Sequence, residues 1–190
     1  GAARVPARLN FASGDLVPVF SAHDLWIEGE FALRLGKDLA PRDREYSRDE
    51  VIDAIDGVAP ALEVVGSRLA EGIAKGGRFR VTADGGANVT LTTGAVFADW
   101  RRFDLPNHAL HLSINGSEVA VGIGERALGD PVNVMIWLAN HQRSKDGLKA
   151  GELVSTGTCT GLIRVVPGDL LRADFGEIGT VEARLTGAGA

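Results

Sequence analysis

Two carboxylates alternate along one face of a predicted strand in the first part of the chain. Glu28 and Glu30 lie in the alternating run 27–35, which places Phe31 and Leu33 on the opposite, apolar face. Neighbouring like charges repel each other, so a fold tolerates this pair best in water or around a cation. The pattern therefore allows two interpretations, a solvated strand face or part of a metal site.

A third carboxylate interrupts another apolar, strand-like run. Glu63 lies inside 60–65, where its neighbours are apolar. A buried carboxylate without a partner costs free energy, and oxygen ligands suit hard divalent cations. A metal ion shared by Glu28, Glu30 and Glu63 would explain all three, provided that the two strands meet. The local pattern leaves that pairing open.

Other residue types with chemical potential are scattered. His23 and Asp24 form an adjacent pair on a predicted loop, and such a pair could abstract a proton or activate water. The alternative is a surface histidine. Cys159 has no base beside it in the sequence, so we expect a buried structural thiol rather than a nucleophile. Trp26 and Trp137 are expected in the core.

Composition limits the class of protein. The chain has 190 residues, of which 45% are hydrophobic and 24% charged, as in a single domain with a substantial core. The net charge of −5 and the scattered arginines argue against nucleic acid or an anionic membrane as partner. The apolar stretches are too short to span a bilayer. Cys159 is the only cysteine, which excludes an intrachain disulfide and fits a cytoplasmic location.

The elements that must position these residues are mostly short strands. Twenty-five glycines with alternating apolar runs predict many strands and tight turns. Residues 1–25 are expected to form a loop-rich segment with one edge strand, and residues 26–190 a single metal-binding, catalytic-type domain. Asn115-Gly116 predicts a type I′ hairpin turn. Strands are predicted over 27–36, 60–65, 89–98, 109–114, 118–122, 170–175 and 180–185, and the segment 153–158 is predicted to be a strand that runs into a hydroxyl- and glycine-rich loop.

Three helices are predicted from their start and stop signals. Ser47 and Glu50 form a capping box before a short helix. Asp130 and Pro131 are typical of an N-cap and a first helical position. A third helix is predicted over 67–75, before two glycines. The expected fold is therefore a strand-dominated, mixed α/β domain with a few peripheral helices.

The ordered set of motifs resembles the fumarylacetoacetate hydrolase superfamily, and within it the branch of 2-keto-4-pentenoate hydratases and 4-oxalocrotonate decarboxylases. The resemblance covers roughly residues 26–186 and implies a β-roll of the fumarylacetoacetate hydrolase type. No single motif is decisive, but their order is specific. The segments are Glu28–Leu33, Val58–Arg68, Thr82–Asp84, Asn115–Gly116, Gly129–Asn133, Trp137–Ala139, Leu153–Thr158 and Pro167–Asp169.

The resemblance also implies roles for particular residues. It implies a bound Mg²⁺ or Mn²⁺, and the family's ligands fall on Glu28, Glu30 and Glu63. Asp84 falls on the family's Ala-Asp segment and, with His23, is a candidate catalytic residue; a simple Asx turn is the alternative for Asp84. The candidate substrate-binding residues form the loop Thr156, Gly157 and Thr158.

The implied activity is that of a lyase, a hydratase, which acts on a small 2-oxo or 2-hydroxydienoic acid from aromatic-compound catabolism. The ion would stabilise the enolate of the substrate, and the same chemistry serves a decarboxylase or a C–C hydrolase. A degenerate family member used for binding is a further alternative. The family's upstream Lys-Ile-Gly-Leu-Thr-like motif has no match in residues 1–25, and Gly85-Gly86 replaces polar residues. A homo-oligomer is expected.

Overall fold

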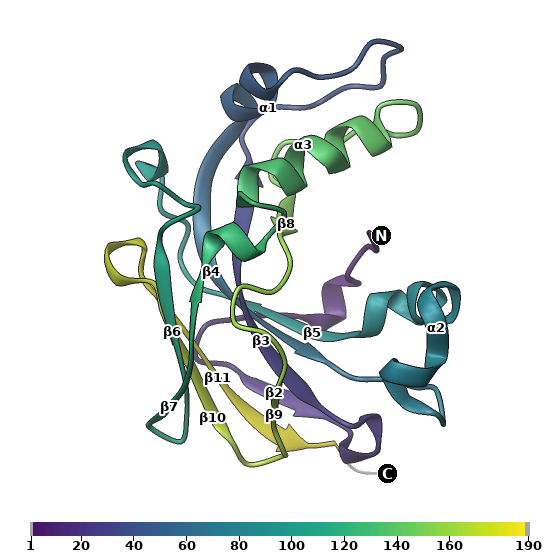
Figure 1. The fold of residues 1–190 in the computed structure, drawn as a ribbon, viewed down its shortest axis with the longest axis vertical. Coiled ribbons are helices and arrows are strands. Elements are labelled where there is room, and N and C mark those ends of the chain that lie inside the picture. The colour runs from purple at the N-terminus through teal and green to yellow at the C-terminus, as the bar shows by residue number, and fades with distance from the viewer. Residues whose placement is uncertain (1, 189–190) are drawn as a thin grey trace.

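The computed structural model describes residues 2–188 as two curved β-sheets with helices at their margins (Figure 1). The first sheet has the order β1 (Asn10–Ala12), β5 (Asn88–Thr93), β4 (Ile55–Val65), β3 (Trp26–Leu35) and β8 (Leu153–Ser155), and β9 (Ile163–Arg164) also pairs with β3. The second has the order β2 (Leu16–Val19), β11 (Thr180–Gly187), β10 (Leu170–Asp174), β6 (Ala109–Ile114) and β7 (Ser117–Ile123). The helices are α1 (Arg48–Ala54), α2 (Gly72–Ala83) and α3 (Pro131–Gln142).

This architecture confirms the predicted strand-dominated, mixed α/β fold. Helices α1 and α3 lie together at one end of the long strands, whereas α2 lies to the side of β5 (Figure 1). Within residues 2–188, no helix has the length and apolar character needed to cross a membrane.

The main core forms between the two sheets. Phe31 on β3 meets Phe175, just after β10, edge to face with ring centroids 5.0 Å apart. Leu33 on β3 and Leu110 on β6 are completely buried, and each such side chain contributes about 1.5–3 kcal/mol to folding. Gly29 permits this packing, because a Cβ there would lie 2.7 Å from Leu110 Cδ1. The apolar face of β3 thus points into the core and its carboxylates point away from it.

The pairing of β3 with β4 brings the predicted carboxylates to one place. The two strands are antiparallel over almost their whole length, and Glu28 lies directly opposite Glu63. Glu30 lies opposite Ala61, so it is a diagonal neighbour of Glu63 on the same face. The sequence predicted both strands, and the register shows that they meet.

Local signals at the helix starts and at the hairpin turn were predicted correctly. Ser47 and Glu50 make both hydrogen bonds of the capping box at α1. Asp130 Oδ1 accepts from the backbone N–H of Val132 at 2.8 Å, which caps α3. Asn115 has φ 52° and begins the turn between β6 and β7. Each of these contacts spans only a few residues.

Replacing Asp130 with alanine is expected to lower the free energy of unfolding by about 1 kcal/mol or more, because the N-cap acceptor is lost. Asp130 also pairs with Arg48 of α1, so part of the loss comes from that contact. Asp130→Asn keeps a capping acceptor and removes only the charge. Urea unfolding of both variants separates the contribution of the N-cap hydrogen bond from that of the ion pair with Arg48. An unchanged midpoint for Asp130→Ala would contradict the capping role.

The helix predicted over 67–75 is misplaced. Residues 67–71 are not helical, and α2 runs from Gly72 to Ala83 with a break at Gly77, whose φ of 69° and ψ of 158° are not helical. Gly76-Gly77, the predicted end of the helix, instead lies inside α2 and divides it. Because glycine adopts such angles at little steric cost, the chain resumes helical geometry beyond it.

Three other expectations differ from the structure. The segment 1–25 contains two edge strands rather than one, and β1 and β2 add parallel strands to different sheets. Strand β5 ends at Thr93 rather than at residue 98: the N–H of Gly94 still donates to the carbonyl of Pro60 at 2.9 Å, but proline has no N–H to continue the pairing. Trp137 was expected in the core but is 41% exposed and stacks on His141.

Candidate metal centre

Three carboxylates converge on the face of the first sheet that points away from the main core. One oxygen from each of Glu28, Glu30 and Glu63 lies within 4.8 Å of the others. Glu30 is only 1% exposed, so a simple solvated strand face does not describe the cluster. The convergence is the geometry that a shared cation requires.

Glu30 is held at one oxygen and left free at the other. Its Oε2 accepts from the hydroxyl of Ser155 and from the backbone N–H of Gly157, the latter at 2.8 Å. Its Oε1 is buried and has no hydrogen-bond partner among the described residues. A buried, unpaired carboxylate oxygen is costly. The protein therefore orients one oxygen of Glu30 and leaves the other available to a ligand.

Ser155, the last residue of β8, and the loop that follows it supply these two donors. The hydroxyl and the N–H of Thr156 both donate to the carbonyl of Phe31, at 2.8 and 3.0 Å. The N–H of Cys159 donates to the carbonyl of Gly29 at 2.9 Å. Between these contacts Gly157 has φ +93°, a conformation that favours glycine. The loop can thus turn its N–H toward Glu30.

The three loop residues predicted to bind substrate have partners within the protein. The hydroxyl of Thr156 and the N–H of Gly157 are used as described above. The side chain of Thr158 hydrogen-bonds to Glu28 and accepts from the N–H of Gly161 at 2.8 Å. In this structure the loop therefore orders the carboxylates, and the assignment to substrate stays a prediction.

Burial and repulsion between neighbouring charges raise the pKa of Glu28 and of Glu63, and so favour their protonated forms when no cation is present. Burial, and then the charge of Glu30, raise the pKa of Glu28 to about 8. Burial also raises the pKa of Glu63 well above its ordinary value, although a hydrogen bond from Asn88 opposes this. A divalent cation would replace those protons, and its preference for hard oxygen ligands matches the three carboxylates. The residues present therefore fit a divalent ion.

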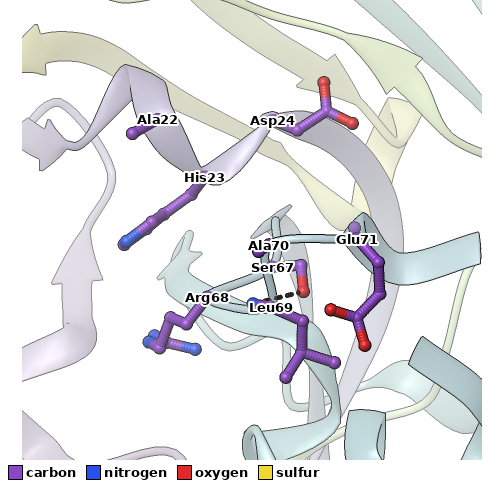
Figure 2. A pocket seen from close by; sticks show the side chains of 9 residues that line it. Ala22, His23, Asp24, Ser67, Arg68, Leu69, Ala70 and Glu71 are labelled. Carbon is purple, nitrogen blue, oxygen red and sulfur yellow. Dashed lines mark hydrogen bonds between the residues drawn. The ribbon is translucent and has the colours of Figure 1, made fainter. Parts of the chain in front are cut away.

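His23 and Asp24 do not form the predicted pair. Asp24 Oδ1 lies 2.7 Å from Arg164 Nη1, and Figure 2 shows its carboxylate turned away from the His23 ring. His23 Nδ1 is buried without a hydrogen-bond partner in the described part of the chain. Burial, and then the charge of Arg68, lower the pKa of His23. Its ring is thus favoured in the neutral form and lacks a carboxylate to orient it.

His23 and Asp84 adjoin the same arginine instead. The backbone N–H of Arg68 donates to Asp84 Oδ2 at 3.0 Å, and the guanidinium lies 3.3 Å from Asp84 Oδ1. His23 and Arg68 line a cavity of about 460 Å³ together with Ser67 and Glu71 (Figure 2). Asp84 therefore makes a tertiary ion pair. This contact is more than the simple Asx turn that was the alternative.

Sequence reasoning missed three residues around the carboxylates. Ser155 donates to Glu30, Asn88 donates to Glu63 at 2.7 Å, and Arg68 donates to the carbonyl of Asn88 at 3.1 Å. Ser155 precedes the hydroxyl-rich loop, so a signal was present. No signal in the sequence indicated Asn88, because its contact with Glu63 depends on the pairing of β5 with β4.

The thiol of Cys159 is expected to be inert in the folded protein. It is fully buried, and burial raises its pKa to about 12. Since the thiolate is the reactive form, a disulfide reagent such as DTNB at pH 8 should modify it only upon unfolding. Absorbance at 412 nm with and without guanidinium measures this. Rapid stoichiometric reaction of the native protein would contradict the burial.

Comparison with known proteins adds independent findings. The sequence model described as fumarylacetoacetate (FAA) hydrolase C-terminal matches residues 6–186. A 2-keto-4-pentenoate hydratase of Paraburkholderia xenovorans (strain LB400) is 33% identical over 174 residues, which are 91% of this chain and 63% of the relative. The chain thus spans less than two thirds of that relative's length.

Two solved structures are similar over nearly the whole chain. 4-Oxalocrotonate decarboxylase from Pseudomonas putida G7, complexed with calcium and acetate, has a TM-score of 0.80 and 28% identity. The same enzyme complexed with magnesium and adipate has a TM-score of 0.79 and 27% identity. Each comparison covers 94% of this chain and 66% of the other.

Proposed function

Because the chain belongs to the fumarylacetoacetate hydrolase family, we propose that it is a divalent-metal-dependent lyase that hydrates a small 2-oxo or 2-hydroxydienoic acid. The observation that carries the proposal is the cluster of three carboxylates, in which Glu30 keeps one buried oxygen unpaired. The similarity to a 2-keto-4-pentenoate hydratase supports hydration as the reaction.

Glu28, Glu30 and Glu63 would hold the ion, with Mg²⁺ or Mn²⁺ as the proposed metal. When bound, the ion supplies Lewis-acid polarisation of the substrate's 2-oxo group. Ser155 and Gly157 keep Glu30 in place. The geometry of the carboxylates is thus set before a ligand binds, which lowers the cost of binding.

Roles for the remaining predicted residues also belong to the proposal. The hydrogen bond of the Thr158 side chain to Glu28 supports the proposal that the loop 156–158 contacts a substrate carboxylate next to the metal centre. His23 lines the cavity of about 460 Å³ and is favoured in the neutral form, as a proton acceptor must be. Asp84 would act through Arg68, to which it is bound.

Decarboxylation is the second candidate reaction. Both solved structures of the Pseudomonas putida G7 decarboxylase are more than a quarter identical to this chain and share its fold. The metal-bound carboxylates would serve either reaction, since both place negative charge on the same 2-oxo group.

The assembly is proposed as a homo-oligomer and the location as cytoplasmic, because a lone cysteine fits a reducing compartment.

Calorimetric titration with Mg²⁺ and Mn²⁺, with and without oxalate as a mimic of a 2-oxo enolate, tests the metal centre. We expect binding of the ion that oxalate strengthens. Absence of binding at millimolar ion would contradict the proposal and favour a non-catalytic family member. Product analysis then separates the reactions: a hydrated 4-hydroxy-2-oxo acid supports the hydratase, CO₂ the decarboxylase, and two cleaved acids a C–C hydrolase.

A further inference from the structure

Asn88 is a buried polar residue in contact with the carboxylate cluster. Only 7% of it is exposed, and its side-chain Nδ2 donates to Glu63 Oε1 at 2.7 Å. Its Oδ1 is buried and has no hydrogen-bond partner among residues 2–188. The carboxamide is therefore satisfied on the side that faces Glu63 and unsatisfied on the other.

An irregularity in the pairing of β4 with β5 places Asn88 beside Glu63. The register shifts between Val64 and Val65, so that Val65 lies opposite Asn88 while Glu63 lies opposite Leu91. Val65 and Glu63 share one face of β4 because side chains alternate along a strand. The shift thus brings Asn88 diagonally next to Glu63.

The backbone of Asn88 is held from outside the sheet. Arg68 Nη2 donates to its carbonyl at 3.1 Å, and Arg68 is itself paired with Asp84. A chain of contacts therefore runs from Asp84 through Arg68 and Asn88 to Glu63. Both the main chain and the side chain of Asn88 are fixed relative to the carboxylates.

We propose that Asn88 is a positioning residue of the metal centre, which fixes one oxygen of Glu63 so that the other faces Glu28 and Glu30. This inference rests on the proposed function, since it requires that the cluster binds an ion. Glu63 is then held in the same manner as Glu30, whose Oε2 takes the protein's donors. Partners that orient metal ligands in this way strongly affect metal affinity.

A neutral amide suits this task better than a cationic side chain. Elsewhere on β3, Arg34 pairs with Asp56 at 2.7 Å. The charge of Asp56 is thus balanced by an arginine, whereas the hydrogen-bond donor to Glu63 is neutral. An arginine beside Glu63 would compete with a metal ion for the carboxylate charge. An amide donor orients the carboxylate and leaves its charge available. The unpaired Oδ1 of Asn88 also argues against a purely structural role, because structural amides are usually satisfied at both ends.

The test compares Mg²⁺ affinity by calorimetry for the wild-type chain, Asn88→Leu, Asn88→Ala and the matched control Thr90→Val. Thr90 lies on the same strand, is 1% exposed and has a hydroxyl without a partner in the described chain, but it lies opposite Val64 on the other face. We expect both Asn88 variants to bind Mg²⁺ roughly 10- to 100-fold more weakly, and Thr90→Val to bind as the wild type does. Melting temperatures in excess EDTA check that each variant is folded.

The outcomes separate this inference from the function on which it rests. Wild-type affinity in folded Asn88 variants would overturn the positioning role and leave the metal centre intact. An equal loss of affinity in Thr90→Val would also overturn it, because the effect would then be general to the strand. Unfolding of both Asn88 variants would assign the residue to stability instead. If the wild-type chain binds no Mg²⁺, both proposals fail.

Discussion

Glu30→Gln is expected to bind Mg²⁺ more than roughly 100-fold more weakly than the wild-type chain. A loss of up to roughly 100-fold follows from removing only a hydrogen-bond partner of a metal ligand, and removing the ligand itself has a larger effect. Glutamine keeps the volume of the side chain but removes the negative charge at the centre of the cluster. Glu30 is the most buried of the three carboxylates at 1% exposure, and its unpaired Oε1 is the atom that the ion would contact. Calorimetry and turnover should therefore fail together.

The same variant should be at least as stable as the wild-type chain when no metal is present. The charge of Glu30 raises the pKa of both Glu28 and Glu63, so its removal relieves repulsion. Glu118→Gln is the matched control, because Glu118 is an exposed carboxylate paired with His111 on the second sheet. Unchanged affinity in Glu30→Gln, or an equal loss in Glu118→Gln, would show that the cluster does not bind the ion.

The metal-free protein is expected to become less stable as the pH rises from about 4.5 to about 8. The pKa of Glu28 is raised in the folded state from its ordinary value of 4.5 to about 8. Between these values Glu28 binds more protons in the folded than in the unfolded chain, so its contribution to the free energy of unfolding decreases with rising pH, whereas the lowered pKa of His23 acts in the opposite sense. The loss is on the order of 2 kcal/mol, since one pKa unit corresponds to about 1.4 kcal/mol and relaxation around the site reduces the effect.

Added Mg²⁺ should reverse this trend, because the ion replaces the protons. Its stabilising effect should increase with pH up to about 8, and at one hundred times the dissociation constant it reaches about 2.7 kcal/mol. Urea unfolding from pH 5 to pH 8.5, in EDTA and in Mg²⁺, measures both terms. Glu28→Gln should flatten the metal-free profile. A metal-free profile that Glu28→Gln leaves unchanged would contradict the raised pKa of Glu28.

Much of the local structure could be predicted because its determinants lie within a few residues of each other. The capping box at Ser47 and Glu50 is complete. The alternation of β3 separates Phe31 from Glu30. The position of α2 could not be predicted, because a glycine such as Gly77 is compatible with a helix end and with a break inside a helix.

The candidate site also combines features that follow from local sequence with features that only the fold sets. The sequence alone determined that Glu28 and Glu30 share a strand face and that Glu63 is an acid in an apolar strand, because side-chain direction follows from strand periodicity. Only the tertiary structure decided that Glu63 lies opposite Glu28, that the loop beside β3 turns its N–H toward Glu30, and that Asn88 meets Glu63. Register, loop path and strand irregularities depend on packing between residues far apart in the chain, and a local pattern does not contain that information.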